Sequence, residues 1–495
     1  MMARPLRVLT VTSEAVPFAK TGGLADVAGV LPESLAQLGC EVRGVLPRYR
    51  QVDRAKLGLE PIASPELRTF AGKDVTRQFL QTRTAGGVEW YFVDAPEFYD
   101  RPNLYTADGK DYPDNFERFA FFCQEVLELI RLIDWKPDII HCHDWQSGLI
   151  PGYLKVPVRT SLIDTGNPFY RGIRTLFTVH NIAYQGLFPK GEFPLTGYDP
   201  SHFIPDEFEF YGKVNFMKAG LIFADRLSTV SRRYAEEVQT PEFSRGMEGV
   251  LEWRAKDLVG ILNGIDVDDW DPKNDPALPA HYGADDLSGK DACRRALLKS
   301  QGLEARAGAP VVGMITRLDA QKGLDLVEAA FDRIMDLGVR MIVLGTGAPQ
   351  YHAMLERMAK AYPRQLALNL RFDPTLARQI EAGADMFLMP SRFEPCGLNQ
   401  MYSLRYGTVP IVHATGGLVD TITDYSPRTR TGNGFSFDKY TPRALVAAMR
   451  RAVRLFADRQ RWLALVRTGM RQDFSWQASA QKYVELYRDM LGEES

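Results

Sequence analysis

The chain has 495 residues, a length that predicts about two domains of roughly 200 to 250 residues each. Hydrophobic residues make up 45% of it, and 60 basic against 62 acidic residues leave a formal net charge of -2. Proteins that bind nucleic acids or membrane surfaces usually carry an excess of basic residues, which this chain does not have. We therefore expect neither a nucleic acid nor a membrane as a partner.

Five cysteines are scattered along the chain without a Cys-x-x-Cys pair, which argues against a disulfide framework or a zinc site. The N-terminus has only five or six apolar-leaning residues before Ser13, too few for the core of a signal peptide. No segment approaches the ~20 apolar residues of a membrane span. We therefore expect a soluble, cytoplasmic protein without a cleaved leader.

Short β-branched runs alternate with longer helix-like stretches, which is the rhythm of a parallel sheet. The first half opens with a strand at 6–12, a helix at 24–38 and a strand at 41–46. Further buried strands are predicted at 90–93, 139–142, 175–179 and 226–230. Residues 98–113 are predicted to form a surface connection. An N-terminal Rossmann-like domain is thus expected over residues 1–262.

Residues 263–295 are rich in Asp, Pro and Gly and predict a connection between domains. A second series of strands follows at 310–316, 339–344, 367–372, 385–389 and 409–413. This predicts a C-terminal Rossmann-like domain over residues 263–475, so the fold class is α/β with two doubly wound domains. The helical segment 476–495 has no strand after it, and we expect it to pack back on the N-terminal domain.

The first strand-to-helix junction contains Lys20, Gly22 and Gly23. In open parallel sheets ligands lie beyond the carboxyl ends of the strands, where a Gly-Gly pair lets backbone amides approach a phosphate. The alternative is a flexible loop in which Thr21 caps the helix.

This junction, Lys20-Thr21-Gly22-Gly23-Leu24-Ala25-Asp26-Val27, resembles the N-terminal signature of bacterial glycogen synthases and plant starch synthases. Further segments resemble the same family in the same order: Pro137–Trp145, Val179–Asn181, Ala224–Ser231, Gln239–Phe243, Asn263–Asp266, Arg317–Gly323, Ser391–Leu398 and Thr415–Leu418. The resemblance covers nearly the whole chain.

The resemblance implies a GT-B glycosyltransferase in which two Rossmann-like domains face each other across a deep cleft. It implies glycogen synthase activity, the retaining transfer of glucose from ADP-glucose to the non-reducing-end 4-hydroxyl of an α-1,4-glucan. The N-terminal domain would hold the acceptor and the C-terminal domain the donor. No metal or organic cofactor is implied.

A departing diphosphate needs cations aimed at it, and Arg317 and Lys322 follow the strand at 310–316. Isolated surface cations are more often merely solvated, but in the resembled family the matching residues hold the diphosphate. The resemblance also implies that Asp144 faces the sugar and acceptor, that His180 contacts the donor glucose, and that Glu394 is the main carboxylate. The remaining donor-binding residues expected are Lys20, Gly22, Gly23, Asn263, Cys396, Gly397, Leu398, Thr415, Gly416 and Gly417.

Three local patterns bear on the chemistry of the site. On an extended strand His141 and His143 share one face and no complementary pair follows at zinc-ligand spacing, so a metal site is not expected. Cys396 has no His adjacent in sequence to activate it as a nucleophile. Many retaining GT-B enzymes carry a second glutamate eight residues after the first, whereas Tyr402 stands there in this chain.

Other functions remain open at this point. An NAD-dependent oxidoreductase would show Gly-x-Gly-x-x-Gly after residues 6–12, which is missing. A catalytically silent glucan-binding protein and a glucosyltransferase that uses UDP-glucose or another acceptor are the further alternatives. Retention by front-face attack is our hypothesis, with double displacement as its rival, and closure of the two domains on the donor is a second hypothesis. The sequence does not predict an oligomeric state.

Overall fold

The computed structural model of the protein describes residues 4–107 and 109–493. Residues 1–3, part of the N-terminal segment expected not to be a signal peptide, lie outside this range. The chain forms two compact units, one made of residues up to 230, 235–264 and 476 onward, the other of 231–234 and 265–475. Residues 231–234, which we had expected in the first domain, belong to the second unit, where the Ser231 hydroxyl donates to the Pro395 carbonyl at 2.6 Å.

The first unit is built on a ten-stranded sheet whose main path runs β15-β14-β10-β9-β1-β2-β6-β5-β3. Its strands are β1 (Arg7–Val11), β2 (Glu41–Pro47), β3 (Glu60–Pro61), β4 (Glu66–Phe70), β5 (Lys73–Arg83), β6 (Glu89–Asp94), β9 (Ile139–His143), β10 (Arg174–Val179), β14 (Arg226–Thr229) and β15 (Leu258–Gly260). From β15 to β6 all neighbours are parallel. The predicted parallel strands are therefore present, and β1 lies between β9 and β2.

An antiparallel extension of this sheet was not predicted. Strand β5 pairs antiparallel with β6, β3 and β4. Its residues are polar and exposed at both ends, and buried positions occur only in its interior, so its sequence lacks the uniform apolar run of a central strand. The expected surface connection 98–113 also differs, since it contains part of α2 (Pro96–Tyr99) and the hairpin β7 (Thr106–Ala107) with β8 (Lys110–Asp111).

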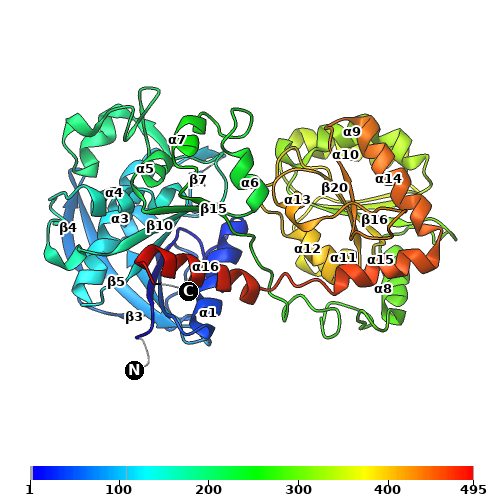
Figure 1. The fold of residues 1–495 in the computed structure, drawn as a ribbon, viewed down its shortest axis with the longest axis horizontal. Helices are drawn as coiled ribbons and strands as arrows, with labels where there is room; N and C mark the ends of the chain where they lie inside the picture. The colour runs from blue at the N-terminus through cyan, green and yellow to red at the C-terminus, as the bar shows by residue number, and fades with distance from the viewer. Residues whose placement is uncertain (1–3, 108, 494–495) are drawn as a thin grey trace. The chain divides into compact units, whose positions relative to one another are not determined.

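Helix α1 (Gly23–Gln37) begins directly after Gly22 and buries Leu24, Val27, Leu31 and Leu35 at helical spacing. Helix α16 (Trp476–Leu491) lies beside it in Figure 1 and shares its hydrophobic cluster through Trp476, Tyr483 and Tyr487. The C-terminal helix is thus part of the first unit.

The first unit also contains the α-helices α3 (Asn115–Leu132), α4 (Leu149–Lys155), α5 (Phe216–Phe223) and α7 (Glu248–Trp253), and the strands β11 (Leu187–Pro189), β12 (Glu209–Phe210) and β13 (Lys213–Asn215). Helix α6 (Arg232–Glu237) contains residues of both units.

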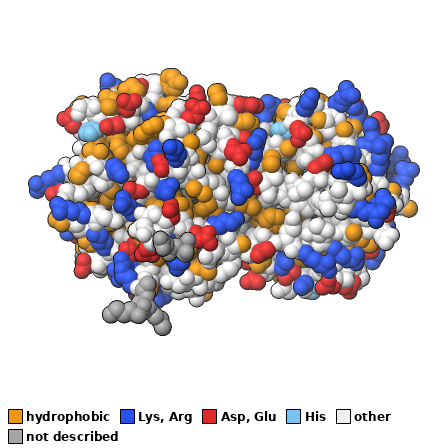
Figure 2. Space-filling model, in the orientation of Figure 1, with side chains coloured by type: hydrophobic (Ala, Val, Ile, Leu, Met, Phe, Trp, Pro, Cys, Tyr) orange, Lys and Arg blue, Asp and Glu red, His pale blue; other side chains and the backbone are white. Residues whose placement is uncertain are grey.

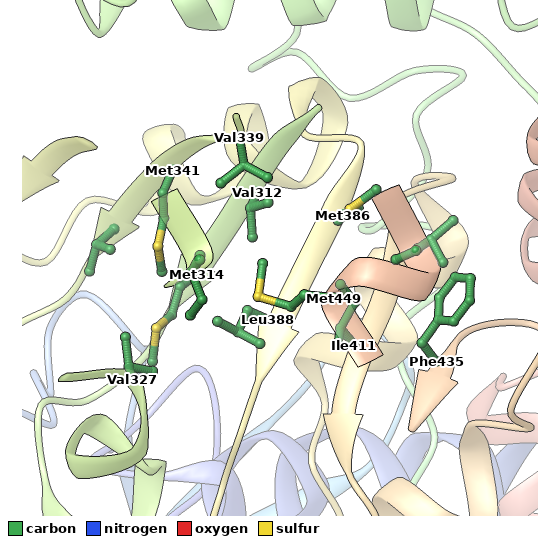
Figure 3. Close-up of a cluster of buried hydrophobic side chains, with 14 of the residues drawn as sticks. Val312, Met314, Val327, Val339, Met341, Met386, Leu388, Ile411, Phe435 and Met449 are labelled. Atoms are coloured by element: carbon green, nitrogen blue, oxygen red, sulfur yellow. The ribbon is translucent and has the colours of Figure 1, made fainter. Parts of the chain in front are cut away.

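The second unit carries an all-parallel six-stranded sheet in the order β18-β17-β16-β19-β20-β21. The strands are β16 (Val311–Ile315), β17 (Arg340–Leu344), β18 (Leu366–Asn369), β19 (Met386–Met389), β20 (Val409–His413) and β21 (Phe435–Phe437). Val312, Met314, Met341, Leu388 and Ile411 project from neighbouring strands into one core, which Val327 and Met449 complete from helices (Figure 3). Burial on both faces explains the continuous apolar runs that identified these strands.

Eight helices described in the second unit complete it: α8 (Ser288–Ser300), α9 (Leu324–Met335), α10 (Pro349–Ala361), α11 (Pro374–Gly383), α12 (Asn399–Arg405), α13 (Gly417–Thr421), α14 (Pro442–Phe456) and α15 (Arg459–Met470). Among the helices described in either unit, none combines the length and apolarity needed to cross a bilayer. Acidic and basic side chains are interspersed over the face drawn in Figure 2, with basic ones gathered at its right-hand edge.

Candidate active site

Asp144 and His180 meet at the carboxyl ends of β9 and β10 in the first unit. The Asp144 amide donates to the Thr178 carbonyl at 3.0 Å, and the His180 amide donates to Oδ1 of Asp144 at 2.7 Å. Asp144 has a positive φ of 55°, an uncommon conformation for a residue other than glycine. Burial raises the pKa of Asp144 to about 7, although the amides of His180 and Asn181 act in the opposite direction. The two predicted residues are therefore directly bonded.

Three buried histidines, His141, His143 and His180, lie together on and after strands β9 and β10. Nδ1 of His143 is 2.9 Å from Nε2 of His180, and the His141 and His143 rings have their centroids 4.0 Å apart. Burial lowers the pKa values of His141 and His180 to about 3, and it lowers the pKa of His143 well below its usual value. All three rings are thus neutral at pH 7. Within the described residues no three His, Cys, Asp or Glu side chains could hold a metal ion.

The loop between β1 and α1 is organised by Glu14, which follows β1. One carboxylate oxygen, Oε2, accepts the amides of Thr21 at 2.5 Å and Gly22 at 3.0 Å, and Oε1 accepts the Thr21 hydroxyl at 2.6 Å. Thr21 therefore bonds Glu14 and does not cap α1, whose N-cap Gly22 offers no side chain. The Gly22 amide, which we had assigned to a phosphate, already binds a carboxylate.

Lys20 precedes this loop and is about half exposed. Its ammonium lies 2.6 Å from Oδ1 of Asp26, the acidic residue in the first turn of α1. A donor phosphate would have to compete with that carboxylate.

Lys322 and Glu394 form an ion pair in the second unit. Nζ of Lys322 is 3.0 Å from Oε1 and 2.7 Å from Oε2 of Glu394, and the Ser391 hydroxyl donates to Oε2 at 2.8 Å. Lys322 ends a short turn after β16, while Ser391 and Glu394 follow β19, the neighbouring strand. Gly323 comes next with φ +72°, where a side chain would strike the Pro390 carbonyl. The pair thus lies at the carboxyl edge of the sheet, as predicted for ligand-binding residues.

The loop before α13 packs on the loop that carries Glu394. The Gly417 amide donates to the Glu394 carbonyl at 3.1 Å and the Pro395 carbonyl at 3.2 Å. A Cβ at Gly416, which has φ +46°, would lie 2.0 Å from the same Glu394 carbonyl. Glycine is required here because the two loops touch through their backbones. Thr415, the residue before them, is buried.

The other predicted residues differ in their exposure and contacts. Arg317 has a side chain 57% exposed, with its guanidinium 3.5 Å from Asp319. The side-chain amide Nε2 of Gln400 donates to the carbonyls of Cys396 and Gly397 at 3.1 and 3.0 Å, and Leu398 leads into α12. Asn263, which was predicted to lie in the C-terminal domain, belongs to the first unit; it is buried, and its Oδ1 finds no hydrogen-bond partner among the described residues.

Three further residues near the carboxyl ends of strands, Glu14, Tyr184 and Phe372, received no role from the sequence alone. Glu14 was visible as a charge directly after a buried strand, which is a usable signal. Tyr184, 57% exposed, lies four residues after His180, and Phe372, 85% exposed, lies three residues after β18. Solvent exposure of an aromatic ring depends on the fold, so no local pattern could have identified these two.

Comparison with known proteins agrees with the fold. Residues 7–253 match the family model described as starch synthase catalytic domain, and residues 298–464 match the one described as glycosyl transferases group 1. Two α/β units with ligand-binding candidates at the carboxyl edges of their sheets define the class of the protein, a two-domain glycosyltransferase of the GT-B fold.

Full-length relatives give the particular family. A glycogen synthase of Anaeromyxobacter dehalogenans (strain 2CP-1) is 47% identical over 486 residues, and one of Geotalea daltonii is 45% identical over 486 residues. Each alignment covers 98% of this chain and 99% of the relative. The chain belongs to the glycogen synthase family. The catalytic domain of starch synthase IV from Arabidopsis thaliana, solved with ADP and acarbose, has a TM-score of 0.88 at 34% identity, covering 99% of this chain and 100% of that one.

Proposed function

We propose that the chain elongates an α-1,4-glucan by transferring glucose from ADP-glucose to the 4-hydroxyl of its non-reducing end, with retention of configuration. The observation that carries this proposal is the Lys322–Glu394 pair at the carboxyl edge of the second sheet, where the exposed Arg317 also follows β16. The two cations suit a diphosphate, whose negative charge grows as the bond to the sugar breaks. The ADP bound by the Arabidopsis starch synthase domain supports ADP-glucose, not UDP-glucose, as the donor substrate.

The second unit also offers a surface for a nucleotide base. Phe372 follows β18 at the same edge of the sheet as Arg317, and its ring is 85% exposed. Planar bases stack on exposed aromatic rings with ~1–3 kcal/mol per base. We assign the adenine of the donor to this ring.

The first unit offers groups for the sugars. Asp144 and His180 present a carboxyl group and a neutral imidazole at one point, and Tyr184 exposes its ring close by in sequence. Exposed aromatic groups are frequent at ligand-binding surfaces, and a flat ring suits the apolar face of a glucose residue. We assign the donor glucose to His180 and the acceptor glucan to Tyr184 and Asp144.

We infer a front-face reaction. The bond from C1 of glucose to the β-phosphate breaks, the acceptor 4-oxygen forms a bond to C1 on the same face, and its proton passes to the β-phosphate. The protein orients the partners and stabilises the charge. A stable glucosyl adduct on Asp144→Asn or Glu394→Gln enzyme would contradict this inference and favour double displacement.

The decisive experiment measures nucleotide release from ADP-glucose and UDP-glucose, with glycogen and short maltooligosaccharides as acceptors. We expect ADP release that depends on acceptor, elongated glucan as product, and little reaction with UDP-glucose. Release of UDP in preference to ADP would support the alternative donor, and no transfer from either would overturn the proposal. The Arg317→Ala variant should raise the KM for ADP-glucose about tenfold or more, whereas Arg357→Ala, which removes another exposed, ion-paired cation on α10, should leave it unchanged.

The proposal requires no metal or organic cofactor, because Arg317 and Lys322 supply the positive groups. Activity after dialysis against EDTA should equal that of untreated enzyme.

We also place the protein in the cytoplasm, since all five cysteines are free thiols and a reducing compartment would keep them so.

A further inference from the structure

A row of buried polar side chains crosses three neighbouring strands of the first sheet. Nε2 of His141 on β9 is 2.6 Å from the Thr178 hydroxyl on β10, which is 2.5 Å from the Ser228 hydroxyl on β14. All three side chains are fully buried. The parallel register places them there, because Thr178 is paired with Ser228, and His141 with Leu176, two residues before Thr178.

The row ends at the C-terminal helix. The hydroxyl of Tyr487 on α16 lies 2.8 Å from Nδ1 of His141, although 346 residues separate the two in sequence. Tyr487 is fully buried, and the ring of Tyr483, one turn earlier, lies with its centroid 5.3 Å from that of His141. Both nitrogens of His141 are therefore occupied.

The direction of these hydrogen bonds follows from the chemistry of the groups. A phenol is a stronger donor than an aliphatic hydroxyl, and a neutral imidazole has one N–H and one acceptor nitrogen. Tyr487 then donates to Nδ1 of His141, and Nε2 of His141 donates to Thr178. Tyr487 thereby fixes both the tautomer and the plane of the His141 ring.

His141 transmits this orientation to the candidate site. Its ring packs on that of His143 with 4.0 Å between centroids, and Nδ1 of His143 bonds Nε2 of His180 at 2.9 Å. The backbone carbonyl of Thr178, its other partner, accepts the amide of Asp144. A change in the orientation of the His141 ring would therefore alter the positions of both Asp144 and His180.

We propose that Tyr487 is a positioning residue for His180, so that the C-terminal helix holds the donor-sugar histidine of the first unit through His141 and His143. The inference rests on the proposed function of His180. Tyr487 contacts no substrate; its hydroxyl sets the ring against which the histidine pair packs, and packed side chains leave that pair a single arrangement.

The first test is Tyr487→Phe, which removes only the hydroxyl. The matched control is Tyr153→Phe, since Tyr153 is equally buried in the first unit and its hydroxyl bonds Gln124 at 3.2 Å. We expect Tyr487→Phe to lower kcat about tenfold, below the ~100-fold that a 1 Å misplacement can cost, with the KM for ADP-glucose changed less than twofold. Tyr153→Phe should change neither constant, even where both variants lose similar thermal stability.

A double-mutant cycle separates positioning from general damage. If Tyr487 acts through His180, adding Tyr487→Phe to His180→Ala should change kcat less than twofold, whereas a purely structural effect would lower kcat again by the same factor. Ring ¹⁵N resonances give a second readout that does not depend on activity: Tyr487→Phe should shift those of His141, His143 and His180, and Tyr153→Phe none of them.

Equal losses in both backgrounds, or unchanged His143 and His180 resonances, would overturn the inference. These outcomes differ from failure of the proposed function, which would appear as wild-type protein that releases no ADP in the presence of glucan.

Discussion

The ammonium group of Lys322 contacts both carboxylate oxygens of Glu394, at 3.0 and 2.7 Å. The side chains are only 18% and 8% exposed, so each charge depends on the other for compensation. A diphosphate that binds Lys322 must therefore draw it partly from Glu394, and donor binding would leave the carboxylate with the Ser391 hydroxyl as its remaining partner.

Removing one member of this pair should cost both stability and activity. We expect Lys322→Met to lower kcat/KM at least ~100-fold, through loss of a phosphate ligand, and the free energy of unfolding by about 2 kcal/mol, because Glu394 keeps an uncompensated charge. The double variant Lys322→Met/Glu394→Gln should regain most of the stability and none of the activity. Urea unfolding and initial rates measure the two effects, and a double variant as unstable as the single one would contradict this account.

Phe372 should contribute to donor binding alone. Because an exposed ring that stacks on a base is worth ~1–3 kcal/mol, Phe372→Ala should raise the KM for ADP-glucose about tenfold and leave the KM for glycogen unchanged. Leu67→Ala provides the control, since Leu67 is 69% exposed in the first unit. Steady-state kinetics with each substrate varied in turn would show the difference, and an unchanged donor KM would remove Phe372 from the site.

Tyr184 should affect the acceptor in the opposite way. Tyr184→Ala is expected to raise the KM for glycogen several-fold without changing that for ADP-glucose, since the exposed ring offers a stacking surface and no charge. Tyr184→Phe keeps the ring and should behave as wild type. If both variants lose acceptor affinity equally, the hydroxyl and not the ring would be the binding element.

The buried histidines predict an acid-sensitive fold. Their pKa values in the folded protein are depressed, to about 3 for His141 and His180, against about 6.5 in the unfolded chain. Between pH 6.5 and 3 the unfolded chain binds more protons, so the contribution of each histidine to stability falls as the pH falls, by up to ~1.4 kcal/mol per pH unit. Asp144, whose folded pKa is raised to about 7, acts in the opposite direction between pH 4 and 7.

The comparison of two proteins separates these contributions. The stability of His141→Gln, measured by urea unfolding from pH 4.5 to 7.5, should depend less steeply on pH below 6.5 than that of the wild type. Parallel curves for the two proteins would show that His141 is not held neutral.

The sequence predicted the elements whose burial leaves a clear pattern. The six strands predicted in the first sheet and the five predicted in the second have apolar runs or family motifs. The short strands β15 and β21 were missed, as were β3 to β5, of which β5 mixes exposed and buried positions. Lys322 and Glu394 were identified by family motifs, but their mutual contact depends on the adjacency of β16 and β19, which are separated by β17 and β18 in sequence.

Other site features depend on tertiary structure. Glu14 accepts two loop amides that looked free for a phosphate, because its carboxylate folds back from the end of β1. The Tyr487–His141 bond joins residues from opposite ends of the chain, and no local periodicity could reveal it.

The membership of α16 in the first unit makes the second unit an insertion within the first. During synthesis the first unit would remain incomplete until residues 476–491 emerge from the ribosome, whereas most of the second unit is contiguous and is available earlier. A first unit produced by joining Gly264 to Trp476 through a short linker should therefore keep its C-terminal helix, while a fragment ending at residue 264 would expose the apolar face of α1.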